Sequence, residues 1–426
     1  MFKVLVISYY FPPMGLSGVQ RTVKFVKYMK KYNWEPTVIT TGQTGYFAHD
    51  NSLLKEVEDQ NIRIIRTEAN DPYSLMGKHK TMKMPPEYLR KFLSRLSKTF
   101  FIPDNKVSWA NKAYEAAKEL LEKEEFDIIF VTIPPFSSFT MAAKLSKEFD
   151  ISLFVDYRDL WTGNQFAFNP TPYHKYLHKK MEYKALKVAD KIITINRKIK
   201  EKLLNTFQFL TFEDILILPQ GYDEDDFATA VPIPKENNKM RLTYAGIFYE
   251  YVTPKYFLQA FKKLTYERPD VAENIELQFI GHLRKENRNL VNKLGLQAYV
   301  KDYGYLDHKQ TISRLVSSDV LWMMIGRSKN ADSISTGKLF EYFGSRKPII
   351  ACVPDGAAKL AAQEYGAALI TEPDKVDEIK EAILKIHNLY RAGKLPAANE
   401  DFVQKHRRDV LTEQLTKSFQ FYMKAV

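Results

Sequence analysis

A short stretch in the second half of the chain combines small residues, a cation and a carboxylate at the start of a predicted helix. Residues 335–348 read STGKLFEYFGSRKP, and an apolar run typical of a buried strand follows them. If Ser335 or Thr336 caps this helix, the unpaired backbone N–H groups and the helix dipole there favour a phosphate. Lys338 adds a full positive charge close by. These residues therefore predict a site for a diphosphate leaving group.

Glu341 lies one helical turn after Lys338, on the same side of the helix. A carboxylate can accept hydrogen bonds from two ribose hydroxyl groups, which neither lysine nor arginine can do. The alternative is a solvent-facing Lys–Glu pair, which contributes only about 0.2–0.5 kcal/mol. Because the segment lies between two predicted strands, where an α/β fold places its ligand, we favour a nucleotide site.

Two glycines, Gly15 and Gly18, follow the predicted strand at 3–8. Glycine allows a ligand to approach the backbone closely, and the start of the next helix favours an anion. The sequence lacks the full G-x-G-x-x-G pattern, so it does not support a dinucleotide site. A turn that only requires a positive φ angle remains the alternative.

A charged cluster, DYRDLW (156–161), ends another predicted strand. It places Arg158, Asp159 and Trp161 at the edge of the sheet where ligands bind in α/β folds. An ordinary Arg–Asp pair at the surface is the alternative to a functional role.

Apolar runs typical of short strands alternate with helical patterns along the whole chain, which implies right-handed βαβ units and parallel sheets. The predicted N-terminal domain is 1–218, and the polar, proline-containing segment 219–239 reads as a linker. The pattern restarts over 240–405, and 406–426 forms one further amphipathic helix. We therefore expect an α/β protein with two Rossmann-like, doubly wound parallel-sheet domains that face a central cleft.

The composition is that of a globular protein with a basic surface. The 426 residues include 63 Lys and Arg against 51 Asp and Glu, a formal net charge of +12. Such a charge favours nucleic acid, anionic lipid or phosphorylated ligands. A single cysteine, Cys352, excludes disulfides within the chain and cysteine-based metal sites. The N-terminal apolar run is too short for a signal peptide, and no run is long enough to span a bilayer, so we expect a cytoplasmic protein.

One basic and apolar segment, 78–103, predicts contact with a membrane surface. Apolar side chains form one stripe on its helix, with four cations off the stripe, which is typical of an interfacial helix. The stripe is Leu89, Phe92, Leu93, Leu96 and Phe100, and the cations are Arg90, Lys91, Arg95 and Lys98. The alternative is a packed helix with a solvated basic face. Nucleic acid is not expected, because the positive charge is scattered and no binding motif is present.

Four stretches in order resemble the retaining GT-B glycosyltransferases of family 4 (group 1), of the type that builds exopolysaccharides and lipid-linked glycans. They are ISYYFPPMGLSGVQRTVKFVKYMKKYNWEPTVIT (7–40), VDYRDLW (155–161), ILPQGYDEDDF (217–227) and TGKLFEYFGSRKPIIA (336–351). The resemblance implies transfer of a sugar, with retention, from a UDP- or GDP-linked donor bound by the C-terminal domain. The acceptor, a glycan or polyprenyl-linked glycan, would bind the N-terminal domain, and the tail helix would cross back to that domain.

The resemblance also implies roles for single residues. Lys338 and Asp159 would be catalytic, and Gly15, Gly18 and Arg158 would form the phosphate and acceptor loop. The donor would contact Glu341, Thr336, Ser335, Gly337, Gly246, Gly281, Arg327 and Leu339. No cofactor or metal is expected, because protein cations and helix dipoles neutralise the leaving group.

The chain departs from the family pattern at three positions. Ser333 stands where many members have a second glutamate, and Ile247 and Val252 replace an arginine and a lysine. We therefore expect the diphosphate either to be held by Lys338 together with Arg327, Arg284 or Lys255, or to be held more weakly than in the family. Two other functions stay open: a GT-B-shaped sugar-nucleotide epimerase, and a catalytically weak homologue that binds nucleotide sugars.

Overall fold

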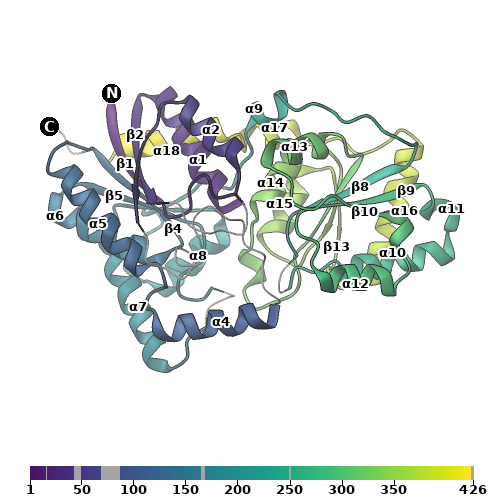
Figure 1. Cartoon of the computed structure of the whole chain (residues 1–426), viewed down its shortest axis with the longest axis horizontal. Helices are drawn as coiled ribbons and strands as arrows, with labels where there is room; N and C mark the ends of the chain where they lie inside the picture. The colour runs from purple at the N-terminus through teal and green to yellow at the C-terminus, as the bar shows by residue number, and fades with distance from the viewer. Residues whose placement is uncertain (16, 43–48, 69–86, 165–167, 249–250, 424–426) are drawn as a thin grey trace. The chain divides into compact units, whose positions relative to one another are not determined.

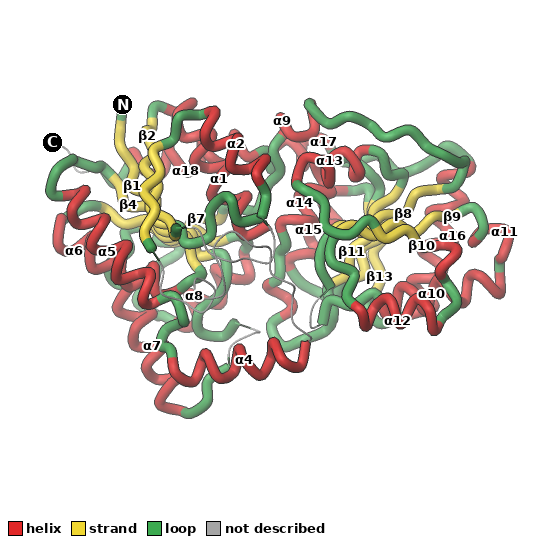
Figure 2. The backbone as a smooth tube through the Cα atoms, viewed as in Figure 1, coloured by secondary structure: helices red, strands yellow, loops and turns green. Residues whose placement is uncertain are grey.

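The computed structural model describes residues 1–15, 17–42, 49–68, 87–164, 168–248 and 251–423. The chain divides into two compact units, one of Met1–Pro219 with Arg408–Val426 and the other of Gln220–Arg407. Each unit has its own parallel sheet enclosed by helices, as the strands and helices of Figure 2 show.

The first unit contains a seven-stranded parallel sheet in the order β3-β2-β1-β4-β5-β6-β7. Its strands are β1 (Phe2–Ile7), β2 (Trp34–Thr41), β3 (Arg63–Thr67), β4 (Ile128–Ile133), β5 (Ser152–Tyr157), β6 (Lys191–Thr194) and β7 (Ile215–Ile217). The neighbours β4 and β5 are buried along their whole length. Helices cover both faces of such a sheet, which explains why these strands read as nearly continuous apolar runs.

The described part of the first unit also contains helices. They are α1 (Ser17–Met29), α2 (Asn51–Asp59), α4 (Glu87–Phe100), α5 (Val107–Leu121), α6 (Phe136–Phe149), α7 (Pro172–Leu186), α8 (Arg197–Thr206) and α18 (Arg408–Gln420). Right-handed crossovers place α1 and α6 on opposite faces, since β2 and β5 lie on opposite sides of the β1–β4 pair. Helices α5 and α6 lie side by side (Figure 1), and α18 packs against α1.

The second unit contains a six-stranded parallel sheet in the order β10-β9-β8-β11-β12-β13. Its strands are β8 (Met240–Ala245), β9 (Ile275–Ile280), β10 (Val300–Asp302), β11 (Val320–Met324), β12 (Ile349–Cys352) and β13 (Ala368–Thr371). Its helices are α9 (Glu224–Ala228), α10 (Lys255–Glu267), α11 (Pro269–Ala272), α12 (Lys285–Lys293), α13 (His308–Val316), α14 (Gly337–Gly344), α15 (Ala357–Tyr365), α16 (Val376–Arg391) and α17 (Glu400–Lys405).

An aromatic cluster forms part of the core of the second unit. Trp322 of β11 is fully buried and stacks on Phe257 of α10 with ring centres 3.8 Å apart. Tyr244 at the end of β8 stacks on Phe248 at 4.1 Å. This packing fixes the carboxyl end of β8, where the chain then turns at Gly246.

The prediction of two Rossmann-like, doubly wound parallel sheets is confirmed. In both sheets the strand order reverses beside the first strand of the unit, which lies between β2 and β4 in one sheet and between β9 and β11 in the other. Loops diverge at such a point and leave a crevice beyond the carboxyl ends of the strands, where α/β proteins bind ligands. No helix in the described part of the chain is long and apolar enough to cross a membrane.

Candidate functional site

The start of α14 presents polar groups that lack partners. Thr336 precedes the helix in an extended conformation, and its side chain makes no capping hydrogen bond. The Thr336 Oγ1 atom is buried and has no hydrogen-bond partner among the described residues. The first backbone N–H groups of any helix also lack partners within it. With Ser335 buried directly before this point, the helix start is suited to binding an anion.

Buried residues fix α14 against the end of β8. The buried side chains of the helix include Leu339, Phe343 and Tyr342. The Tyr342 Oη atom accepts a hydrogen bond of 2.7 Å from the backbone N–H of Ala245, the last residue of β8. The side chain of Leu339 is fully buried. If Leu339 contacts the donor as predicted, it can do so only through its backbone. The packing therefore holds the start of α14 at the point where the strand order of the second sheet reverses.

Lys338 extends from α14 to the end of β8. Its Nζ atom donates a hydrogen bond of 2.8 Å to Tyr244 Oη and lies 4.5 Å from the centre of the Tyr244 ring. Burial lowers the pKa of Lys338 to about 8, against the opposing effect of the nearby Glu341 carboxylate. The ammonium group is thus held in a poorly solvated position, where a bound anion would gain most from it.

Two glycines make room for this lysine. Gly246 has a φ angle of +139°, and a Cβ atom there would meet Lys338 Nζ at 2.5 Å. Gly281, which follows β9, has a φ angle of +116°, and a Cβ atom there would collide with the carbonyl group of Gly246. The positive φ angle favours glycine at both positions. Gly246 lies against the end of the Lys338 side chain and against Gly281, so the structure brings Gly246, Gly281 and Lys338 together.

His308 links Glu341 to a second carboxylate. The His308 Nδ1 atom lies 3.6 Å from Glu341 Oε1, and the Nε2 atom lies 2.8 Å from Asp226 Oδ2. His308 begins α13 and Asp226 belongs to α9, so three helices of the second unit meet at this imidazole. The sequence analysis missed His308, because its position in the chain gives no sign of its contact with α14.

Arg327 is engaged away from this group. Its guanidinium pairs with Glu372 at 2.5 Å and with Asp374 at 3.2 Å, and its side chain is about half exposed. The structure therefore gathers Ser335, Thr336, Lys338 and Glu341 at the start of α14, whereas Arg327 contacts the residues that follow β13. The sequence offers no signal for this pairing.

The predicted residues of the first unit lie at the ends of β1 and β5. Arg158 is buried, and its guanidinium donates hydrogen bonds to three backbone carbonyl groups, those of Gly18, Ile133 (3.3 Å) and Pro134 (3.1 Å). Arg158 thus holds together the segments that follow β1, β4 and β5. Asp159 beside it is exposed, and Gly15 is buried.

A buried ion pair supports the same edge of the first sheet. Arg21 of α1 contacts Asp156 of β5 at 2.8 Å, and both side chains are almost fully buried. Arg21 also donates to the carbonyl groups of Leu218 and Pro219. Removing one partner of a buried pair typically costs about 3–5 kcal/mol, so we assign this pair to the fold.

Comparison with known families gives one match. Residues 226–405 match the model of a family described as "Glycosyl transferases group 1". This range contains α14 and His308. No curated protein sequence matches the chain.

Solved structures show the same fold over almost the whole chain. Sucrose-phosphate synthase from Thermosynechococcus elongatus is 14% identical, with 99% of each chain covered and a TM-score of 0.65. HepE from Anabaena, in complex with UDP-glucose, is 12% identical over 99% of this chain and 100% of that chain, with a TM-score of 0.64. The pneumococcal O-GlcNAc transferase GtfA, in complex with UDP and GlcNAc, is 13% identical over 100% and 99%, with a TM-score of 0.61. The chain therefore has the GT-B fold.

Proposed function

We propose that the chain is a glycosyltransferase that transfers a sugar from a UDP- or GDP-linked donor to a glycan or lipid-linked acceptor, with retention at the anomeric carbon. The match of residues 226–405 to the group 1 family supports this proposal. The observation that carries it is the position of Lys338, whose ammonium group lies at the end of β8 beside the unpaired groups at the start of α14.

The leaving diphosphate would bind at the start of α14. The Thr336 hydroxyl and the first N–H groups of the helix would donate to its oxygens, and Lys338 would neutralise the charge that develops as the bond to the anomeric carbon breaks. Loss of one such donor typically lowers the rate about 10²–10³-fold. Retention follows if the acceptor oxygen attacks from the face that the diphosphate leaves.

The donor nucleoside would be held by Glu341. Its carboxylate would accept hydrogen bonds from two ribose hydroxyl groups, with His308 fixing its orientation at 3.6 Å. On the acceptor side we propose Asp159, which follows β5, as the group that orients the acceptor hydroxyl. We propose that Lys338 and the helix dipole replace a metal ion, so EDTA leaves the activity unchanged.

We also propose that α4 docks the enzyme on the cytoplasmic face of an anionic membrane, where a lipid-linked acceptor lies. The stripe predicted from the sequence is exposed, from 38% at Leu89 to 76% at Phe100. Arg95 and Lys98 lie on the same helix, and each cation near an anionic surface contributes about 1 kcal/mol. Residues 78–86 of the predicted segment lie outside the described residues.

A panel of UDP-, GDP- and dTDP-sugars tests the proposal. Each donor is incubated with the protein and a pool of glycan and lipid-linked acceptors, and products are followed by NMR at the anomeric centre. We expect release of the nucleotide diphosphate and a product with the anomeric configuration of the donor. An epimerised donor without transfer would assign the chain to the epimerases. Binding of the donor without turnover would indicate that the chain only binds nucleotide sugars.

A further inference from the structure

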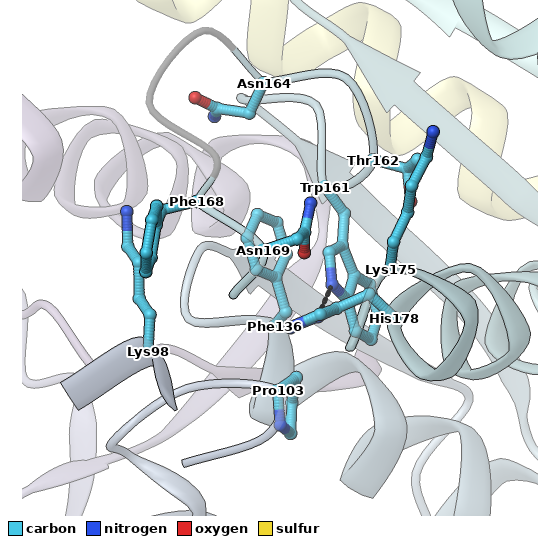
Figure 3. A pocket seen from close by; sticks show the side chains of 10 residues that line it. All are labelled: Lys98, Pro103, Phe136, Trp161, Thr162, Asn164, Phe168, Asn169, Lys175 and His178. Carbon is cyan, nitrogen blue, oxygen red and sulfur yellow. Dashed lines mark hydrogen bonds between the residues drawn. The ribbon is translucent and has the colours of Figure 1, made fainter. Parts of the chain in front are cut away.

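Helix α7 has an inner face that is fixed to the first unit. Its His178 Nδ1 atom accepts a hydrogen bond of 2.9 Å from Trp161 Nε1, as the dashed line in Figure 3 marks. Glu182, the one acidic residue of the helix, is fully buried and accepts a hydrogen bond of 3.0 Å from the backbone N–H of Thr162. Both contacts join α7 to the segment that follows β5. The negative charge of the helix is therefore turned inward.

The outer face of α7 carries unpaired positive charge. From Tyr173 to Lys187, every exposed side chain is a tyrosine or a lysine, and the lysines are Lys175, Lys179, Lys180, Lys184 and Lys187. None of these lysines makes an ion pair with a described residue, whereas Arg197 of the basic helix α8 pairs with Glu201 at 2.8 Å. Like charges four residues apart, as at Lys175 and Lys179, destabilise a helix. An anion from outside the chain would relieve this repulsion.

Three tyrosines are exposed among these lysines. Tyr173 is 64% exposed, Tyr176 58% and Tyr183 43%. The Lys180 ammonium group lies 5.6 Å from the centre of the Tyr176 ring. Tyrosine concentrates at the headgroup level of membranes, because its ring is apolar and its hydroxyl is polar. We call the five lysines and these three tyrosines the lysine–tyrosine face of α7.

This face continues the exposed apolar stripe of α4. At the start of α7, the His174 Nε2 atom lies 3.1 Å from the backbone oxygen of Thr99 in α4. Lys98 of α4 and Lys175 of α7 line the same pocket (Figure 3). Beside Thr99, Phe100 is 76% exposed. Nucleic acid also binds surfaces that combine cations with aromatic rings, but the leucines of the α4 stripe suit the acyl chains of a membrane.

We propose that the lysine–tyrosine face of α7 binds the headgroups of anionic lipids. Its lysines pair with the headgroup phosphates, and Tyr173 and Tyr176 lie at the headgroup level while α4 inserts its apolar stripe. A cluster of about four to eight cations on one helix is typical of such recognition. The inference rests on the membrane docking proposed for α4 and adds to it a second helix that selects anionic lipid. It does not depend on glycosyl transfer.

Flotation of the full chain with vesicles of phosphatidylcholine, with and without phosphatidylglycerol, tests the inference. We expect wild type to prefer the vesicles that contain phosphatidylglycerol. The triple variant Lys175→Gln, Lys179→Gln and Lys180→Gln should lose about 100-fold in partition into them. The matched control removes three exposed lysines of the second unit and should float as wild type does; it combines Lys293→Gln, Lys385→Gln and Lys394→Gln. All six side chains are exposed, so both triple variants should fold.

Salt separates the part played by α7 from that played by α4. Because salt screens exposed charges, added salt should weaken the binding of wild type. The α7 triple variant should bind weakly at all salt concentrations, since only the apolar stripe of α4 remains. Tyr173→Ser combined with Tyr176→Ser should lower the partition several-fold and leave its salt dependence unchanged.

Each other outcome overturns a defined part of the inference. Equal loss of flotation in the α7 variant and the control would assign the effect to net charge, and unchanged flotation in both would remove α7 from the docking surface. Binding of a single-stranded RNA oligonucleotide that is lost in the α7 variant, with unchanged flotation, would give the face to nucleic acid. Selective loss of flotation in the α7 variant, with no transfer from any donor, would support the lipid site and remove the proposed function.

Discussion

The Lys338 ammonium group is held between the Tyr244 ring and Gly246, and burial lowers its pKa to about 8. Only the charged form can stabilise a leaving diphosphate. We therefore predict that kcat/KM, which reports the free enzyme, falls as the pH rises above about 8. In Lys338→Arg the guanidinium stays charged, so this falling limb moves to higher pH.

Full pH profiles of both proteins check this prediction. Lys338→Met removes the charge altogether, and we expect kcat to fall about 10²–10³-fold in this variant. Lys309→Met, which alters an exposed lysine of α13, serves as the control. An alkaline limb at the same pH in wild type and Lys338→Arg would assign the titration to another group.

The Glu341 carboxylate is largely buried and lies beside His308. We predict that Glu341→Ala weakens the binding of UDP or GDP about tenfold or more, since each hydrogen bond to a charged group contributes about 1.5–3 kcal/mol. Calorimetric titration measures the affinity, and thermal unfolding measures the stability. Glu364→Ala, at an exposed position of α15, is the control. A large loss of melting temperature with unchanged nucleotide affinity would give Glu341 a structural role.

Single residues also show which parts of the site could be predicted from the sequence. Lys338 and Glu341 are one turn apart in one helix, so their common position could be predicted from spacing alone. Arg327 pairs with Glu372 and Asp374 beyond the next strands, and His308 reaches Glu341 from another helix. Contacts of this kind depend on how helices pack, which no local pattern encodes.

Among the elements, α9, α13 and α14 are joined by one imidazole. His308 lies between Asp226 and Glu341, so we assign it the role of positioning Glu341. We predict that His308→Ala raises KM for the donor several-fold while kcat changes less, because Lys338, the proposed catalytic lysine, stays in place. His308→Gln, whose amide can still donate to a carboxylate, restores most of the affinity.

Steady-state kinetics of the two His308 variants against donor concentration separate these effects. A purely structural role would lower the amount of folded protein in His308→Ala and leave KM of the folded fraction unchanged. Equal losses in kcat and in kcat/KM would instead indicate a direct part in the chemical step.

Helix α4 exposes the apolar stripe that the sequence predicts. We expect Phe92→Glu combined with Leu96→Glu to reduce flotation with vesicles that contain anionic lipid, because the variant loses apolar contact and adds repulsion. Both side chains are exposed, so the fold should tolerate the change. Tyr266→Glu alters an aromatic residue of α10 that is even more exposed, at 75%, and this variant should float as wild type does. Flotation that is independent of anionic lipid in all three proteins would contradict membrane docking.

The alternation of strands and helices could be predicted from the sequence because buried parallel strands are apolar over their whole length. The short strand β7 has only three residues, too few to show a hydrophobic pattern that would predict a strand. The predicted linker 219–239 contains the five-residue helix α9, whose run of acidic residues resembles a loop. Its Asp223 accepts a hydrogen bond from the Asp225 N–H, a capping signal that could have identified the helix.

At the scale of the whole molecule, the chain builds two sheets, and its last helix belongs to the first of them. Length and the repeated strand–helix pattern were enough to predict two domains, since a single core stops growing beyond about 250–300 residues. The return of the chain to the first unit depends on α18, whose Phe419 meets Trp34 at 5.0 Å and Phe154 at 4.7 Å. An amphipathic pattern predicts that a helix packs on the protein, but it does not identify the aromatic side chains against which the helix packs.

Phe419 and Phe421 offer a matched test of this anchoring. Phe419 is fully buried and Phe421 is 87% exposed, although they are two positions apart. Phe419→Ala should lower the free energy of unfolding by about 3–5 kcal/mol, the usual cost of removing a buried phenylalanine, whereas Phe421→Ala should change it by less than about 0.5 kcal/mol. Because the proposed nucleotide site lies within the second unit, UDP or GDP affinity at low temperature should match wild type in both variants. Loss of nucleotide binding in folded Phe419→Ala would mean that the second unit depends on α18 for its own structure.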